Sequence, residues 1–456
     1  MAFNSLEEMC ELVVDCPHST PKWTESGYYV LRNQNIRNGV LDLSNPSFTD
    51  KAGYESRIKR ATPKVGDIVF TREAPMGEVC QIPENLICCL GQRQVLLRPK
   101  DTIDGDYLFW ALQSPQVQHQ ISWNEGTGST VSNVRIPVLK SLKIPRLNSL
   151  DAEIFTAKTL TDIHKKIRLN RQINQTLEEM AQAIFKSWFV DFDPVRAKMQ
   201  ALENGGTEED ANLAAMEVIS GKSIQQLETM QAENPNQYQQ LHHTASLFPN
   251  AMQDSELGEM PVGWSVALFS EIADLNTKSV KPNKEPETIW EHYSIPAFDS
   301  GPQPSLDTGE SIKSNKYLVQ KSAILASKLN PSTERTWLPF VEDTETAICS
   351  TEFMQFVPIN ADDRAFVYCM IRSEPFQHGI LSRVTGTTGS RQRAQPKEVS
   401  IIQVIKPTPD LTTVFNQQVT HWLNMIGNNQ KQIKTLAELR DALLPKLLSG
   451  CVEIKF

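Results

Sequence analysis

The sequence predicts an α+β protein: two similar mixed α/β globular domains, each followed by a long helix, with the two helices pairing as an antiparallel coiled coil. An internal repeat is the first observation behind this fold class. The stretch QTLEEMAQAIFKSWF at 175–189 aligns with KTLAELRDALLPKLL at 434–448 at a constant offset of 259 residues (434 − 175), which indicates two copies of one unit. Apolar residues three and four positions apart in both stretches are the second observation, because that spacing marks one face of a helix.

The region before each helix is repeated as well. EGTGSTVSNVRIPVLKSLKIP at 125–145 resembles TGTTGSRQRAQPKEVSIIQVIKP at 385–407, and DIVFTR at 67–72 resembles AILASK at 323–328. We therefore predict five segments along the chain. They are a first domain at 1–150, a first long helix with an aromatic end at 151–198, an acidic linker or loosely attached helical insert at 199–260, a second domain at 261–409, and a second long helix at 410–456.

Each predicted helix is longer than a compact domain needs. A helix of about 35–40 residues spans roughly 55 Å at 1.5 Å per residue, so we expect the two helices to pair. Two copies related by a twofold axis face in opposite directions, which predicts an antiparallel pair. Asn170 and Asn429 lie on the apolar seam near the middle of each helix, where a buried Asn pair would fix the register. The alternative is that each helix lies separately on its own domain.

One segment carries the formal net charge of −9. Residues 201–260 contain ten acidic residues and a single basic one, Lys222, which leaves 44 acidic and 44 basic residues in the rest of the chain. Net charge therefore neither excludes nor favours a nucleic-acid partner, and local patches must decide. The eight cysteines include no CxxC pair, so no metal site is predicted and buried, reduced thiols are expected.

Basic, glycine-rich loops before each helix are the candidate binding elements. In EGTGST and TGTTGS, glycine lets the backbone approach a ligand closely, while Ser and Thr offer small donors and acceptors. Residues 121–146 carry four basic residues against one acidic residue, and residues 380–406 carry five against one. Such loops suit phosphate contacts and hydrogen bonds to base edges, although a Gly-Thr-Ser loop is also an ordinary turn. The candidate DNA-binding residues are Arg72, Arg93, Thr127, Ser129, Thr130, Ser132, Asn133, Arg135, Lys328, Arg335, Thr388, Ser390, Arg391, Gln392 and Arg393.

No catalytic motif is complete. SGKS at 220–223 ends like a phosphate-binding loop, but Met216 stands where the first glycine is required. Asp193-Pro194 comes nearest to the Asp-Pro-Pro-aromatic motif of a methyltransferase, yet it follows a helix and not a strand. We therefore predict no catalytic residue, no bound metal and no cofactor on this chain.

The first helix ends in an aromatic cluster, Trp188, Phe189 and Phe192, beside several charges. Aromatic side chains next to charged ones suit a subunit interface with an apolar centre and a polar rim. The alternative is that they cap the chain's own helix pair.

Three segments resemble one family: AIFKSWFVDFDPVRAKM at 183–199, SELGEMPVGW at 255–264 and LRDALLPKLLSG at 439–450. Over essentially its full length the chain resembles the specificity (S) subunits of type I restriction–modification systems. The resemblance implies a non-catalytic subunit whose two target-recognition domains each recognise half of a split site in double-stranded DNA. It also implies two modification (methyltransferase) subunits, which bind S-adenosylmethionine and dock on the helices, and restriction subunits in the full complex. The candidate partner-subunit interface is Trp188, Phe189, Phe192, Leu447 and Leu448.

The two loops differ in their side chains, with Arg391 and Arg393 in the second against Thr130 and Ser132 in the first. Different side chains at matching positions predict an asymmetric target. Two other function classes remain open: a coiled-coil scaffold without DNA contacts, and a self-contained DNA-modifying enzyme. No basic leader and no stretch of about 20 apolar residues is present, so we expect a cytoplasmic protein without membrane contact.

Overall fold

The computed structural model describes residues 2–123, 133–385 and 392–450. The chain divides into two compact units, the first formed by residues 1–170 and 432–456 and the second by residues 171–431. Each unit therefore contains one mixed domain and one part of each long helix. None of the helices among the described residues is long and apolar enough to span a membrane.

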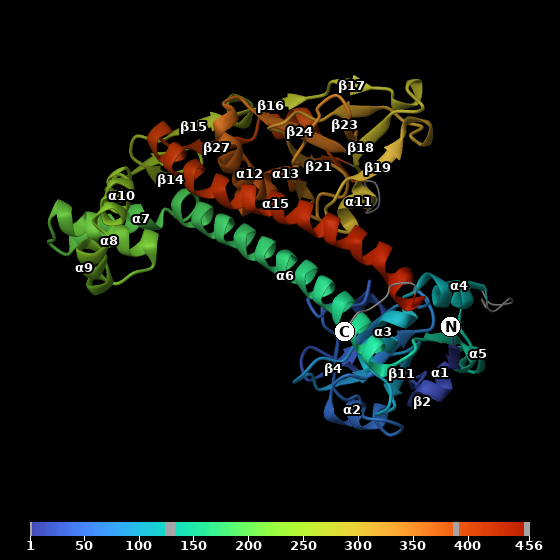
Figure 1. Ribbon diagram of the computed structural model, residues 1–456. Helices are drawn as coiled ribbons and strands as arrows, with labels where there is room; N and C mark the ends of the chain where they lie inside the picture. The colour runs from blue at the N-terminus through green and yellow to red at the C-terminus, as the bar shows by residue number, and fades with distance from the viewer. Residues whose placement is uncertain (1, 124–132, 386–391, 451–456) are drawn as a thin grey trace. The chain divides into compact units, whose positions relative to one another are not determined.

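Two four-stranded sheets and two strand pairs form the domain of the first unit (Figure 1). Its strands are β1 (Ala2–Ser5), β2 (Cys10–Asp15), β3 (Trp23–Thr24), β4 (Tyr28–Leu31), β5 (Ile36–Arg37), β6 (Val40–Leu41), β7 (Phe48–Thr49), β8 (Ile68–Thr71), β9 (Val79–Gln81), β10 (Cys88–Leu90), β11 (Gln94–Pro99) and β12 (Lys143–Arg146). Its short helices are α1 (Leu6–Met9), α2 (Lys51–Arg57), α3 (Gly105–Leu112), α4 (Pro115–Trp123) and α5 (Ile136–Ser141).

Strand β11 has apolar residues on both faces because both faces of its sheet are covered. Val95 and Leu97 belong to one buried cluster, together with helix α3, and Leu96 belongs to a second cluster on the opposite face. Successive side chains of a strand point to opposite faces, so an uninterrupted apolar run is expected where both faces are buried.

The domain of the second unit repeats this plan. Its strands are β13 (Met252–Ser255), β14 (Gly258–Pro261), β15 (Ser265–Leu268), β16 (Ala273–Asn276), β17 (Ser279–Val280), β18 (Ile289–Tyr293), β19 (Ser305–Thr308), β20 (Lys316–Leu318), β21 (Ile324–Ser327), β22 (Thr336–Trp337), β23 (Ala347–Ser350), β24 (Phe353–Pro358), β25 (Val384–Thr385), β26 (Arg393–Ala394) and β27 (Gln403–Lys406). Its helices after the acidic segment are α11 (Ile295–Asp299), α12 (Arg364–Arg372), α13 (Glu374–Leu381) and α14 (Pro396–Ser400).

One four-stranded sheet corresponds strand by strand in the two domains, with the order β2-β11-β8-β9 in the first and β16-β24-β21-β22 in the second. The other sheet has four strands in the first domain and five in the second. Each domain also has one parallel pair, β4 with β10 and β18 with β23. An antiparallel pair in each domain joins an early strand to the last strand, β1 with β12 and β15 with β27. The prediction of two similar mixed domains is confirmed.

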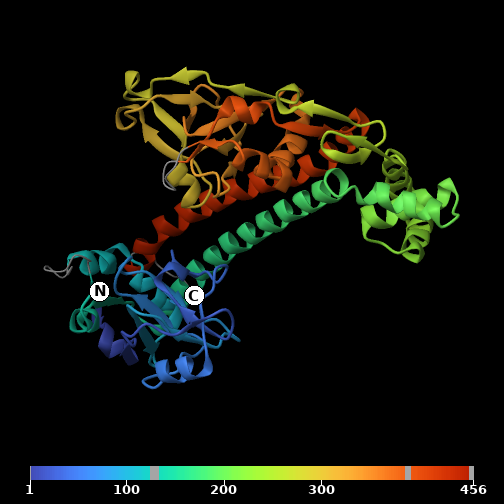
Figure 2. The ribbon, with the colours of Figure 1, turned by 180° about the vertical axis from the view of Figure 1, so that it is seen from behind.

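The two long helices, α6 (Leu150–Phe189) and α15 (Pro409–Leu448), have 40 residues each. In the second unit, Asn429 of α15 hydrogen-bonds Asn174 of α6, and the Phe415 ring lies 5.8 Å from that of Phe185. The residue number thus rises along one helix as it falls along the other, so the helices run antiparallel beside each other in this unit (Figure 2). Packing of the coiled-coil type stays a prediction.

The acidic segment is a small helical bundle and not a linker. It contains α7 (Asp193–Glu203), α8 (Glu208–Ser220), α9 (Ile224–Glu233) and α10 (Pro235–Ser246). The bundle has its own core of Ala215, Met216, Leu227 and Ala245. The buried Lys198 ammonium of α7 donates a hydrogen bond to the Phe248 carbonyl just after α10, which joins the two ends of the bundle. The helical insert was one of the two predicted forms of this segment, and its loose attachment stays a prediction.

Candidate nucleic-acid interface

The first loop candidate returns to the domain at the end of strand β8. The Arg72 amide donates to the Arg93 carbonyl at 2.8 Å, and the Val134 amide donates to the Arg72 carbonyl at 3.1 Å. Glu73 and Asn133 form an isolated antiparallel bridge next to these bonds. Arg72 thereby links the backbone after the loop, at Val134, to the turn before β11.

The second loop candidate returns to its domain in the same way. The Lys328 amide donates to the Glu352 carbonyl at 2.9 Å, and the Ala394 amide donates to the Lys328 carbonyl at 2.9 Å. Leu329 and Arg393 form the matching isolated bridge. Because Glu352 follows Arg93 by the repeat offset of 259 residues (352 − 93), the two loops stand on equivalent backbone.

Arg72 supports the first loop from within the domain. Its side chain is only 12% exposed and its Nη1 lies 2.9 and 2.8 Å from the two carboxylate oxygens of Asp15. Its Nε donates to the Val134 carbonyl at 3.0 Å. A guanidinium held by a carboxylate and a carbonyl is not free for a phosphate, so the DNA-contact role predicted for Arg72 does not fit its surroundings.

Arg93 and Arg393 are more exposed, and each forms an ion pair. The Nε of Arg93 lies 3.1 Å from a carboxylate oxygen of Glu73, and the arginine side chain is 53% exposed. Arg393 binds Glu352 through Nε and Nη2, at 3.0 and 3.1 Å, and is 44% exposed. The hydrogen bonds that Arg393 donates to the Glu352 carboxylate raise the pKa of Arg393.

The other described candidates are spread over both domains. Arg135 is exposed and stands at the N-cap of α5, whereas Lys328 and Gln392 are half-buried. Arg335 forms a two-point ion pair with Asp299 at 2.6 and 3.1 Å, with its side chain 14% exposed, so it holds a helix to the sheet. The candidates Thr127, Ser129, Thr130, Ser132, Thr388, Ser390 and Arg391 lie outside the described residues.

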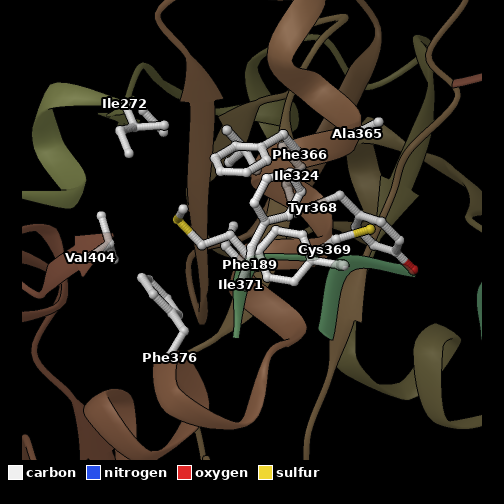
Figure 3. Close-up of a cluster of buried hydrophobic side chains, with 14 of the residues drawn as sticks. Phe189, Ile272, Ile324, Ala365, Phe366, Tyr368, Cys369, Ile371, Phe376 and Val404 are labelled. Carbon is white, nitrogen blue, oxygen red and sulfur yellow. The ribbon is translucent and has the colours of Figure 1, made fainter. Parts of the chain in front are cut away.

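The aromatic end of α6 is buried inside the second unit. Trp188, Phe189 and Phe192 are 2%, 6% and 5% exposed. Their rings contact aromatic rings of the same unit in mostly edge-to-face geometry: Phe185, Phe248, Trp264, Phe366 and Phe415. Figure 3 shows Phe189 among the side chains of helix α12.

This burial corrects the predicted partner interface. Side chains that are enclosed by their own chain cannot dock another subunit, so the alternative of a cap on the helix pair describes Trp188, Phe189 and Phe192. Leu447 and Leu448 are also buried, in the core of the first unit. The sequence could not distinguish the two cases, because an aromatic cluster beside charges is typical of both a core edge and an interface.

The two seam asparagines bond to different partners. The Nδ2 of Asn170, which is 1% exposed, donates to Gln432 at 3.2 Å within the first unit. The Nδ2 of Asn429 donates to Asn174 at 2.8 Å within the second unit. Each asparagine therefore pairs with a side-chain amide of the other helix, about one turn from the predicted Asn170–Asn429 pair.

Sequence reasoning missed the acidic partners Asp15, Glu73 and Glu352. One signal could have found Glu352: it stands at the repeat position of Arg93, with the opposite charge. The described residues contain no group of three or more potential metal ligands. The described cysteines are all buried, and burial raises the pKa of Cys89, for example, to about 11, so this thiol stays protonated at neutral pH.

Comparison with known proteins covers the whole chain. Residues 2–179 match the family model "Type I restriction modification DNA specificity domain". The HindI specificity subunit of Haemophilus influenzae is 31% identical over 64% of this chain and 65% of that protein, just under two thirds of its length. The MjaIX specificity subunit of Methanocaldococcus jannaschii is 25% identical over 97% of this chain and 88% of that protein.

A solved structure supports the fold. The S subunit of a type I restriction–modification system from M. genitalium aligns with 100% of this chain and 96% of its own, with a TM-score of 0.54 and 16% sequence identity. Together with the repeated domains and helices, these matches show that the chain is similar to the specificity subunits of type I restriction–modification systems over most of its length.

Proposed function

We propose that this chain is the DNA sequence-recognition subunit of a type I restriction–modification enzyme. Its two target-recognition domains each bind one half of an asymmetric, split site in double-stranded DNA. One observation carries the proposal: two basic, glycine-rich loops stand on equivalent backbone in two copies of one domain, with different side chains. Shared backbone with varied side chains is what a pair of domains needs to recognise two different half-sites.

The chemistry belongs to partner subunits in this proposal. This chain supplies DNA binding, while modification subunits bind S-adenosylmethionine and transfer the methyl group, and restriction subunits complete the nuclease. Two modification subunits dock on the long helices. The family is generally non-catalytic, which supports this division of roles.

Arg391 provides the test of the DNA-recognition role. Arginine can bind guanine O6 and N7 with two hydrogen bonds, and loss of such a contact costs about 1–3 kcal/mol. We expect Arg391→Ala to relax selectivity in the second domain's half-site alone. The measurement is methylation by the reconstituted complex on substrates randomised in one half-site at a time.

Other outcomes identify other functions. A contact to phosphate alone would weaken binding to all sequences and lower the salt slope by about one. Equal methylation of every substrate by the wild-type complex would favour a scaffold without DNA contacts. Methylation by this chain and S-adenosylmethionine without any partner would make it a self-contained enzyme.

A repeated surface on the helices supports the docking of two copies of one partner. Thr176, Glu179, Met180 and Ala183 of α6 are exposed, and their positions i, i+3, i+4 and i+7 lie on one helix face. The residues at the matching positions of α15 are exposed as well: Thr435, Glu438, Leu439 and Ala442. Packing explains why buried residues repeat, but it does not explain repetition on an exposed face.

We expect Glu179→Lys and Glu438→Lys each to remove one copy of the modification subunit from the purified complex, and the double variant to remove both. Reversing the charge of a residue at a docking surface weakens binding. The new charge faces a like charge on the partner, or leaves the partner's group without its ion pair. The mass of the complex measures the stoichiometry. Gln175→Lys is the matched control, since it installs the residue that already stands at position 434. If the double variant still bound two modification subunits, this helix face would not be their docking surface.

A further inference from the structure

We propose that two ion pairs, Glu73–Arg93 in the first domain and Glu352–Arg393 in the second, are latches that fix the base of each recognition loop. Arg93 and Arg393 then act on half-site choice as positioning residues, through the placement of the loop. The inference rests on the proposed function, and it gives the two arginines a role other than direct contact with bases.

The backbone clamp beneath each loop is the same in both domains. In each domain, the residue that follows a strand (Arg72 or Lys328) donates its backbone amide to a carbonyl in the turn before the next strand. Its own carbonyl accepts a hydrogen bond from the amide of a residue after the loop. The turn residue is Arg93 in the first domain and Glu352 in the second. An equivalent clamp therefore carries opposite charges at the equivalent position.

The ion pair is kept although its charges are rearranged. Where the turn carries the base Arg93, the acid Glu73 stands on the strand side, in the bridge to Asn133. Where the turn carries the acid Glu352, the base Arg393 stands on the loop side, in the bridge to Leu329. If each arginine only contacted DNA, a change of charge at the turn would not need an oppositely charged residue beside it. A latch needs such a residue in both domains.

Backbone conformation and exposure agree with a positioning role. Arg93 has φ of 67°, in the left-handed region that favours glycine, and such a conformation at a non-glycine residue is typical of functional sites. The pairs are partly exposed, at 53% and 23% for Arg93 and Glu73 and at 44% and 28% for Arg393 and Glu352. Solvent screens exposed pairs, so their contribution to global stability is small, and a local effect on the loop base is what remains.

The pairing also limits direct recognition. The Nε and Nη2 groups of Arg393 are both directed to Glu352. The adjacent carboxylate balances the guanidinium charge and so weakens its attraction for phosphate. If the pair is a latch, the Glu352 carboxylate is needed to hold Arg393 in place. If Arg393 contacts a base, the same carboxylate competes with the DNA for the guanidinium.

Charge exchange separates the two roles. Glu352→Arg and Arg393→Glu are made singly and together, in the complex reconstituted with modification subunits. We expect each single variant to lower selectivity for the second half-site about tenfold, a coupling typical of residues in contact, and the double variant to restore it. If Arg393 instead contacts a base, the double variant stays as defective as Arg393→Glu, and that result would overturn the latch.

The first domain supplies the matched control. Exchange of Glu73 and Arg93 should give the same loss and rescue for the first half-site only. Loss in the other half-site would contradict a local latch.

Hydrogen exchange provides a readout that does not depend on DNA. The Val134 and Ala394 amides, which donate to Arg72 and Lys328, should exchange faster in the single variants of their own domain and return to the wild-type rate in the exchanged pair. Unchanged rates in the single variants would sink the proposal even where DNA recognition holds. A wild-type complex without half-site selectivity would sink the proposed function and leave this measurement of the latch intact.

Discussion

Replacing Trp188 and Phe189 with alanine is expected to unfold much of the second unit. Both rings are almost fully enclosed, at 2% and 6% exposed, and Phe189 lies in edge-to-face contact with Phe366 at 5.1 Å and Phe415 at 5.2 Å. Truncation of a buried aromatic side chain costs about 3–5 kcal/mol through lost burial and the cavity left behind. Two such losses are comparable to the whole stability of a typical domain, about 5–15 kcal/mol.

Urea unfolding followed by circular dichroism, with soluble yield, measures this effect. Trp123→Ala is the matched control, because Trp123 is 80% exposed on helix α4 and its loss should leave the unfolding curve unchanged. A soluble double variant with a wild-type unfolding curve that no longer binds the modification subunit would contradict the core assignment. That result would restore the aromatic interface predicted from sequence.

The repeat made the architecture predictable. The helices repeat at a constant offset and the segments before them at nearly the same one. Such a repeat depends only on the order of residues, so it identified two copies of one unit and both long helices, which have 40 residues each. The antiparallel direction followed from the same symmetry. Sheet pairing did not follow, because the strands of each domain pair across long sequence separations that local periodicity does not report.

Burial and partners were harder to predict. The segment 199–260 has the composition of a linker, yet a few apolar residues such as Met216 and Leu227 are sufficient for a small bundle core. Arg72 was predicted to contact DNA because it is basic and lies in a repeated segment. Asp15, 57 residues earlier, occupies its side chain instead, and no local pattern links the two.

Lengthening both long helices together should change the distance between the half-sites. Seven residues inserted after Asn170 in α6 and after Lys431 in α15 leave the contacts within each unit intact, since Asn170 bonds Gln432 and Asn174 bonds Asn429. Each insertion adds about 10 Å of helix and turns the following residues by only about 20°. A length of about 10 Å corresponds to about three base pairs at 3.4 Å each.

We therefore expect the reconstituted complex to keep both half-site sequences and to prefer a spacer about three base pairs longer. The readout is the set of methylated sites recovered from a library with random spacers. An insertion in α6 alone should abolish methylation, because it moves one helix out of register with the other. A five-residue insertion in both helices should also fail, since it rotates one unit by about 140°. Unchanged spacer length with altered half-site bases would show that the helices do not set the spacing, and that the loops respond to helix length in some other way.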